Sequence, residues 1–150
     1  MTRKILNLTI LFMFVFLLVS CQSQTERKKG EWIKYRTDKG GSVILYNNDF
    51  IKNSKGDVIQ VWNKRVFNNK TREEVIQERK NDGLPTTGYE KLDEDIFLVD
   101  VDCKNRKHRY LNHIELDSNR NILSSSTNST DWEYTIPDSI MDELRKKVCK

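Results

Sequence analysis

The chain has 150 residues, 32% of them charged, and a formal net charge of +4 at pH 7. This length fits a single domain with a modest core, and so small a net charge disfavours nucleic acid as a partner. The sequence contains only two histidines, which disfavours a metal site.

The first twenty residues have the order of parts of a bacterial lipoprotein signal peptide. Two basic residues near the start precede an almost continuous apolar stretch over residues 5–19. This stretch is shorter than the roughly 20 apolar residues that span a membrane. Leu18-Val19-Ser20-Cys21 then resembles the lipobox, whose cysteine is acylated and becomes the new N-terminus. We therefore predict removal of residues 1–20 and lipidation of Cys21, with an uncleaved anchor helix as the alternative.

Removal of the signal peptide lowers the charge further. It takes away Arg3 and Lys4 and no acid, so 24 of the 26 basic residues remain beside 22 acidic ones, a net charge of +2. Residues 21–30 contain no large apolar side chain and are predicted to be a lipidated, flexible tether. Gln22 follows the lipidated cysteine, and by the usual bacterial sorting rule a residue other than aspartate there favours the outer membrane.

The folded domain is predicted to cover residues 31–150 and to begin with three strands. Residues 32–36 and 42–47 alternate in strand fashion on either side of the turn Asp38-Lys39-Gly40-Gly41. Residues 57–67 form a long run of β-branched and aromatic side chains. This run favours a third strand that contains a bulge or is partly buried on both faces.

A short, mostly exposed helix is predicted next, over residues 72–81. Thr71 and Glu74 have the spacing of a capping box at its start, and Asn81-Asp82-Gly83 is a stop signal at its end. The following loop leads to a predicted short edge strand at 88–92.

Residues 96–103 form the densest apolar run of the exported domain and are predicted to be the central strand of an antiparallel sheet. Period-two geometry assigns one side of this strand to Phe97, Val99, Val101 and Cys103. The opposite side is assigned to Ile96, Leu98, Asp100 and Asp102.

Two further segments are predicted to extend the sheet, at 107–116 and 122–125, and residues 132–135 are predicted to return to the folded domain after a polar loop. In the first of them the same period places His108 and His113 on opposite faces, out of reach of one metal ion. It also groups Tyr110, Ile114 and Leu116 on one side.

Residues 137–149 are predicted to be a helix packed on the sheet. Pro137 and the short polar residues after it favour a helix start, and acids precede bases along the segment. Ile140, Leu144 and Val148 form one apolar stripe. The predicted fold class is α+β: a twisted antiparallel sheet of about six strands, a C-terminal helix packed on one face, and a short exposed helix near 72–81.

Cys103 and Cys149 remain once Cys21 carries lipid. In an exported, oxidising setting such a pair indicates a disulfide, which closes a loop of roughly 46 residues. The alternative is a nucleophilic Cys103 with His108 and Asp100 nearby in sequence. Positions 100 and 103 point to opposite faces of a strand, which favours the disulfide.

A locally basic stretch lies between residues 64 and 80. Three glutamates dilute it, so a solvated face is the default and a surface for an acidic partner is the alternative. The candidate ligand surface consists of Lys64, Arg65, Lys70, Arg72, Arg79 and Lys80. No catalytic, cofactor-binding or metal-binding residue is predicted.

Several motifs together resemble the surface-adhesin protein E family of bacterial lipoproteins. The motifs are the lipobox Cys21, Trp32, Val58-Ile59-Gln60-Val61-Trp62, Gly88-Tyr89-Glu90, Val101-Asp102-Cys103-Lys104, Trp132, Ile136-Pro137-Asp138-Ser139-Ile140 and Val148-Cys149. The likeness covers about residues 31–149 and implies a twisted antiparallel sheet with a packed helix and a bonded cysteine pair. Asp138 stands where the family usually has glycine.

The resemblance implies a membrane-anchored, non-enzymatic binding module that adheres to host or matrix proteins and can form a homodimer. Two other classes compete with it, a periplasmic inhibitor of an envelope-targeting enzyme such as a lysozyme, and a cysteine-dependent enzyme. The predicted partners are the membrane, through Cys21, and an unidentified protein ligand, with no nucleic acid and no cofactor.

Overall fold

The computed structural model of the chain describes residues 30–52, 57–127 and 129–149. The predicted signal peptide 1–20, the lipidation site Cys21 and nearly all of the tether lie outside these residues. No helix in the described part of the chain is long and apolar enough to cross a membrane.

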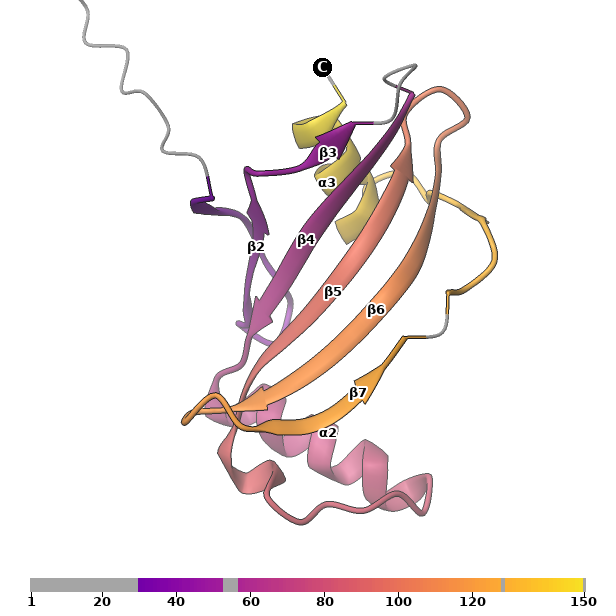
Figure 1. Cartoon of the computed structure of the whole chain (residues 1–150). Helices are drawn as coiled ribbons and strands as arrows, with labels where there is room; N and C mark the ends of the chain where they lie inside the picture. The colour runs from indigo at the N-terminus through magenta and orange to yellow at the C-terminus, as the bar shows by residue number, and fades with distance from the viewer. Residues whose placement is uncertain (1–29, 53–56, 128, 150) are drawn as a thin grey trace, which may run out of the picture.

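One antiparallel sheet organises the described residues (Figure 1). Its main path has the spatial order β1-β2-β4-β5-β6-β7, while β3 pairs with β4 and β8 pairs with β6. The strands are β1 (Trp32–Thr37), β2 (Val43–Asn47), β3 (Ile51–Lys52), β4 (Val58–Val66), β5 (Leu92–Asp102), β6 (Lys107–Asp117), β7 (Ile122–Ser126) and β8 (Glu133–Tyr134). The helices are α2 (Asn69–Asn81), the 3-10 turn η1 (Tyr89–Lys91) and α3 (Ile140–Val148). The predicted α+β class with a C-terminal helix is confirmed.

The core forms where α3 packs on the middle of the sheet. β4 and β5 pair so that Ile59 lies opposite Val101 and Val61 opposite Val99. All four side chains are buried, and Leu144 of α3 packs into the same cluster with no exposed surface. The alternation predicted for the central strand and the apolar stripe predicted for the C-terminal helix therefore meet each other, as expected.

A residue with an unusual backbone conformation directly precedes the N-cap of α3. Ser139 is the N-cap residue, and its hydroxyl accepts a hydrogen bond from the backbone N–H of Asp142. Asp138 just before it has φ 60°, in the left-handed region that favours glycine. This is the position at which the resembled family usually has glycine.

The helix predicted over residues 72–81 starts earlier in the structure, because its N-cap residue is not the predicted one. α2 begins at Asn69, and Asn68 is its N-cap: the Asn68 side chain accepts from the Thr71 N–H while Thr71 Oγ1 accepts from the Asn68 N–H. The predicted capping box of Thr71 with Glu74 is therefore wrong. Thr71 is instead buried, and it accepts a hydrogen bond from Ser42 Oγ at 2.8 Å.

The segment between α2 and the central strand also differs from its prediction. Residues 89–91 form the 3-10 turn η1 instead of an edge strand, after Gly88 with φ 86°. β5 then begins at Leu92, four residues earlier than predicted, so it is longer than the apolar run that marked it.

β6 contains an irregularity that reverses a prediction. The register between β5 and β6 shifts at Leu111, which is the extra residue of a bulge. As a result, the β5 partners of His108 and His113 share one face of the sheet, so both histidines lie on the α3 side. Tyr110 and Ile114 consequently lie on opposite faces, not together as the uninterrupted period predicted.

Candidate functional site

The predicted cysteine pair joins the sheet to the last helical turn. Cys103 and Cys149 are disulfide-bonded with their Cα atoms 5.5 Å apart, and both pack against the main core cluster. The Cys103 sulfur is part of this bond, whereas the alternative hypothesis of a nucleophilic cysteine requires a free thiol there. His108 contacts Thr135 Oγ1 at 3.1 Å, and Asp100 lies on the opposite face of the strand.

The two faces of the sheet are covered differently. α3 packs on one face, and the core contacts of α2 lie with Phe67, Tyr89 and Leu92 at the end of the sheet away from α3. In Figure 1 both helices lie behind the strands, and no helix of the described residues covers the face toward the viewer. We call this the open face. Its residues include Leu45, Asn47, Trp62, Lys64, Ile96, Leu98, Asn112 and Ile114.

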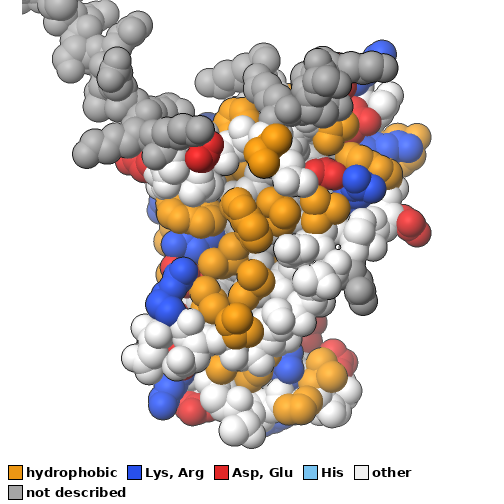
Figure 2. Space-filling view, in the orientation of Figure 1, with side chains coloured by type: hydrophobic (Ala, Val, Ile, Leu, Met, Phe, Trp, Pro, Cys, Tyr) orange, Lys and Arg blue, Asp and Glu red, His pale blue; other side chains and the backbone are white. Residues whose placement is uncertain are grey.

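Side chains on the open face stand in rows across the strands. One row runs in register from β2 to β6 and consists of Leu45, Lys64, Ile96 and Ile114. The neighbouring row passes through Trp62, Leu98 and Asn112. All of these side chains are partly exposed, and Figure 2 shows apolar side chains gathered over the middle of this face.

All three tryptophans of the protein lie on or beside the open face. Trp62 is near its centre, Trp32 is on the β1 edge, and Trp132 lies at the β6 side directly before β8. Lys64 Nζ is 4.6 Å from the centroid of the Trp32 ring, and Arg109 Cζ is 4.6 Å from that of Trp132. A cation over each outer ring holds that ring in place at the rim of the face.

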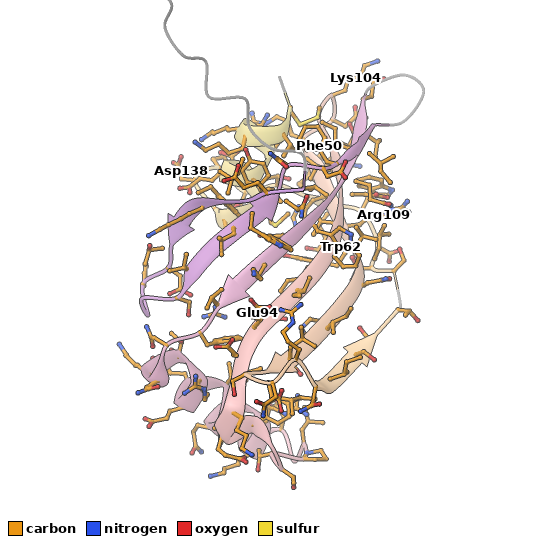
Figure 3. All side chains as sticks on the ribbon, turned by 60° about the vertical axis from the view of Figure 1, so that its left-hand side comes forward. Phe50, Trp62, Glu94, Lys104, Arg109 and Asp138 are labelled. Carbon is orange, nitrogen blue, oxygen red and sulfur yellow. A yellow bond between two sulfur atoms is a disulfide. The ribbon has the colours of Figure 1, made fainter. Side chains whose placement is uncertain are left out.

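Several charges of the open face are paired with one another. Arg109 donates to Asp100 Oδ2 through Nε at 3.0 Å and Nη2 at 2.8 Å, at one end of the face. Toward the other end Lys64 Nζ donates to Glu94 Oε1 at 2.7 Å, and Arg120 pairs with the second oxygen of the same carboxylate. Figure 3 labels Trp62, Glu94 and Arg109 of this face. An approaching molecule thus meets aromatic and aliphatic surface bordered by fixed, neutralised ion pairs.

A cavity of about 270 Å³ lies on the other face, next to the first turn of α3. It is lined by Asp38, Ile44, Asn63, Arg65, Asp95, Phe97, Tyr110, Ile140 and Met141. The lining therefore combines aliphatic and aromatic side chains with charges of both signs.

All three charged residues that line this cavity are in ion pairs. Arg65 Nη2 donates to Asp38 Oδ2 at 2.8 Å, while Arg65 Nε is buried without a hydrogen-bond partner among the described residues. Asp95 pairs with Nε2 of His113, whose ring stacks on Phe97 with centroids 4.4 Å apart. These contacts hold the side chains of Asp95 and His113 in place.

The Asp95–His113 pair holds a proton more tightly than either group would in water. Burial raises the pKa of Asp95, and the hydrogen bond from His113 offsets only part of that effect. Burial alone would lower the pKa of His113, but the hydrogen bond and charge of Asp95 outweigh it and raise that pKa above its ordinary value. One proton therefore stays shared between the two side chains to a higher pH.

The structure does not bring the six predicted basic residues into one surface. Lys64 and Arg65 are consecutive in a strand, so they point to opposite faces of β4. Lys64 is held by Glu94 on the open face, and Arg65 by Asp38 at the cavity.

The predicted basic residues of α2 do not form one surface either. Arg72 donates to the backbone carbonyl at the start of β5, and Arg79 lies 4.0 Å above the ring of Tyr89. Lys70 and Lys80 are exposed, with Lys70 3.9 Å from Glu74. Much of the positive charge that looked available in the sequence is thus used inside the fold.

Comparisons with protein-family models, with curated proteins and with solved structures find no match for this chain. The resemblance to the surface-adhesin protein E family therefore stays a prediction from the sequence motifs. Within residues 30–52, 57–127 and 129–149, no three His, Cys, Asp or Glu side chains are grouped so that they could hold a metal ion.

Proposed function

We propose that this protein is a lipid-anchored, non-enzymatic binding module of the bacterial outer membrane. In this proposal Cys21 attaches the chain to the membrane, and the open face docks a protein partner of the host-matrix class. The observation that carries it is the sheet face that no helix of the described residues covers, with all three tryptophans on or beside it.

The composition of the open face supports docking of a protein. Apolar surface that a partner covers contributes about 25 cal/mol per Å² removed from water. Trp and Arg are the residue types that most often dominate the affinity of protein interfaces, and Trp62, Trp132 and Arg109 supply both here. An apolar centre with a polar rim is also the usual layout of such interfaces.

The open face is also rigid, which favours affinity. Its side chains stand on paired strands, and the Cys103–Cys149 disulfide fixes the helix that supports the sheet from behind. Surface that is already ordered loses less conformational entropy on binding. The carboxylates of Asp100 and Glu94 are held by cations, which supports a role in recognition instead of proton transfer.

The proposal can be tested with the mature lipidated protein, residues 21–150, in detergent. Surface plasmon resonance against immobilised laminin and fibronectin is expected to show saturable binding to at least one of them. Trp62→Ala is expected to weaken that binding at least about tenfold, as for a hot-spot residue. The matched control is Leu84→Ala, which removes an apolar side chain that is 47% exposed in the loop after α2 and should leave binding unchanged.

Two results would contradict this function. One is equal loss of binding in Trp62→Ala and Leu84→Ala. The other is binding to neither matrix protein together with a stable complex with a c-type lysozyme, which would favour the inhibitor class. Antibody labelling of intact cells tests the address: the domain is expected to be labelled without permeabilisation, and labelling only after permeabilisation would place it in the periplasm.

A further inference from the structure

The cavity beside α3 is a second candidate site, independent of the open face. It lies on the opposite side of the sheet, between the first turn of α3 and the floor made by β2, β4, β5 and β6. A ligand bound there would leave the open face free.

Two opposite charges stand next to each other on the floor of this cavity. Arg65 of β4 and Asp95 of β5 are direct partners in the strand register, and both line the cavity. Each has its ion pair with another residue, Arg65 with Asp38, which also lines the cavity, and Asp95 with His113. The cavity lining therefore offers one cationic and two anionic side chains, each of which is in an ion pair.

Arg65 has an unused donor. Its Nε–H is buried and finds no acceptor among the described residues. A buried donor without an acceptor costs about 1–3 kcal/mol, so native proteins rarely keep one without a reason. The Arg65 side chain is itself one third exposed and lines the cavity, so a ligand there can contact it, and a carboxylate is the acceptor that pairs best with a guanidinium.

The rest of the lining is apolar. Phe97 on the floor and Ile140 and Met141 above it can contact an aliphatic side chain. The volume of about 270 Å³ lies just below the roughly 300 Å³ at which pockets for drug-sized ligands begin. The ligand is therefore small.

We propose that this cavity binds a free amino acid with an apolar side chain. The α-carboxylate accepts from Arg65, the α-ammonium donates to Asp95, and the side chain packs against Phe97 and Met141. The charge pattern selects a zwitterion, and the apolar wall selects its side chain.

The test is methyl NMR of the full mature protein with three probes of similar shape. L-leucine carries both charges, 4-methylpentanoate lacks the ammonium, and 3-methylbutylamine lacks the carboxylate. Leucine is expected to shift the methyl signals of Ile44, Ile140 and Met141 in a saturable way. Each half-analogue is expected to bind at least about tenfold more weakly, a loss of about 1.4 kcal/mol.

Variants separate the charge pattern from the apolar wall. Asp95→Asn is expected to weaken leucine binding at least tenfold, and Ile140→Phe, which fills the cavity without changing a charge, is expected to abolish it. Asp93→Asn is the matched control, since it lies two residues away on β5, outside the lining, and should bind like the wild type. If Asp95→Asn does not fold, Ile140→Phe and the half-analogues decide.

Two outcomes would overturn the proposal. One is equal binding of leucine and either half-analogue, which would make the site an apolar or single-charge cavity. The other is no saturable shift with leucine up to about 10 mM. Trp62→Ala is expected to leave leucine binding unchanged, so failure here and failure of the proposed function are distinguishable.

Discussion

Removal of the disulfide is expected to cost a large part of the stability of this domain. The bond joins positions 46 apart in the sequence, from the end of β5 to the residue after α3. For a loop of that length, the chain-entropy relation gives about 4 kcal/mol at 25 °C. Domains of this size are typically stable by about 5–15 kcal/mol in total. The double variant Cys103→Ser, Cys149→Ser should therefore unfold at a much lower urea concentration.

The assay is equilibrium urea unfolding followed by circular dichroism, with and without a reductant. The oxidised wild type is expected to exceed the double variant by about 4 kcal/mol in free energy of unfolding. Reduced wild type should fall to the level of the double variant, which should itself not respond to reductant. A difference below about 1 kcal/mol would refute the reasoning, because the chain-entropy effect would then be absent.

Three further predictions concern the packing and the buried pair. Leu144→Ala should lower the free energy of unfolding by about 2–5 kcal/mol, because Leu144 has no exposed surface; a urea titration showing under about 1 kcal/mol would contradict its place in the core. Gly41→Ala should destabilise by more than about 1 kcal/mol, since φ is 93° and the new Cβ would lie 2.7 Å from Asn68 Nδ2; an unchanged melting temperature would speak against this contact. The pKa of His113 is raised in the folded state, so its pairing with Asp95 stabilises fully below the ordinary histidine pKa and is lost as pH rises through the raised value. NMR titration of His113 should show this raised pKa and Asp95→Asn should lower it; an ordinary value in the wild type would argue that the pair is not formed.

The features that the sequence predicted well are those encoded locally. Alternation along residues 96–103 determines which side chains of β5 are buried, and the four-residue spacing of the α3 stripe determines which side of that helix meets them. The cysteine pair followed from the expected compartment and the number of cysteines. None of these predictions depends on how the strands pair with each other.

The features that the sequence missed depend on contacts between distant segments. The bulge at Leu111 interrupts the alternation of side chains along β6. His108 and His113, which an uninterrupted alternation would place on opposite faces, therefore lie on the same face. Asn68 caps α2 while the turn before β2 packs against it, a contact that no local pattern shows. The Asp95–His113 pair depends on the same bulge.

The candidate site was missed for a related reason. Charge clustering along residues 64–80 suggested a basic surface, but strand alternation and internal ion pairs divide those residues. The gathering of three tryptophans comes from strand order, since Trp32 and Trp132 stand 100 residues apart in the sequence. A signal was present in the alternation of Val58, Trp62 and Val66 along β4, but it did not show that the other tryptophans share their face.

Site-specific photo-crosslinking on intact cells tests the docking role of the open face most directly. A photoreactive phenylalanine analogue would replace Leu98 in the middle of the open face or, as the control, Leu84 in the loop after α2. After incubation with laminin or fibronectin and irradiation, position 98 is expected to give a covalent adduct with the matrix protein and position 84 none. Adduct from position 84 without adduct from position 98 would contradict the account.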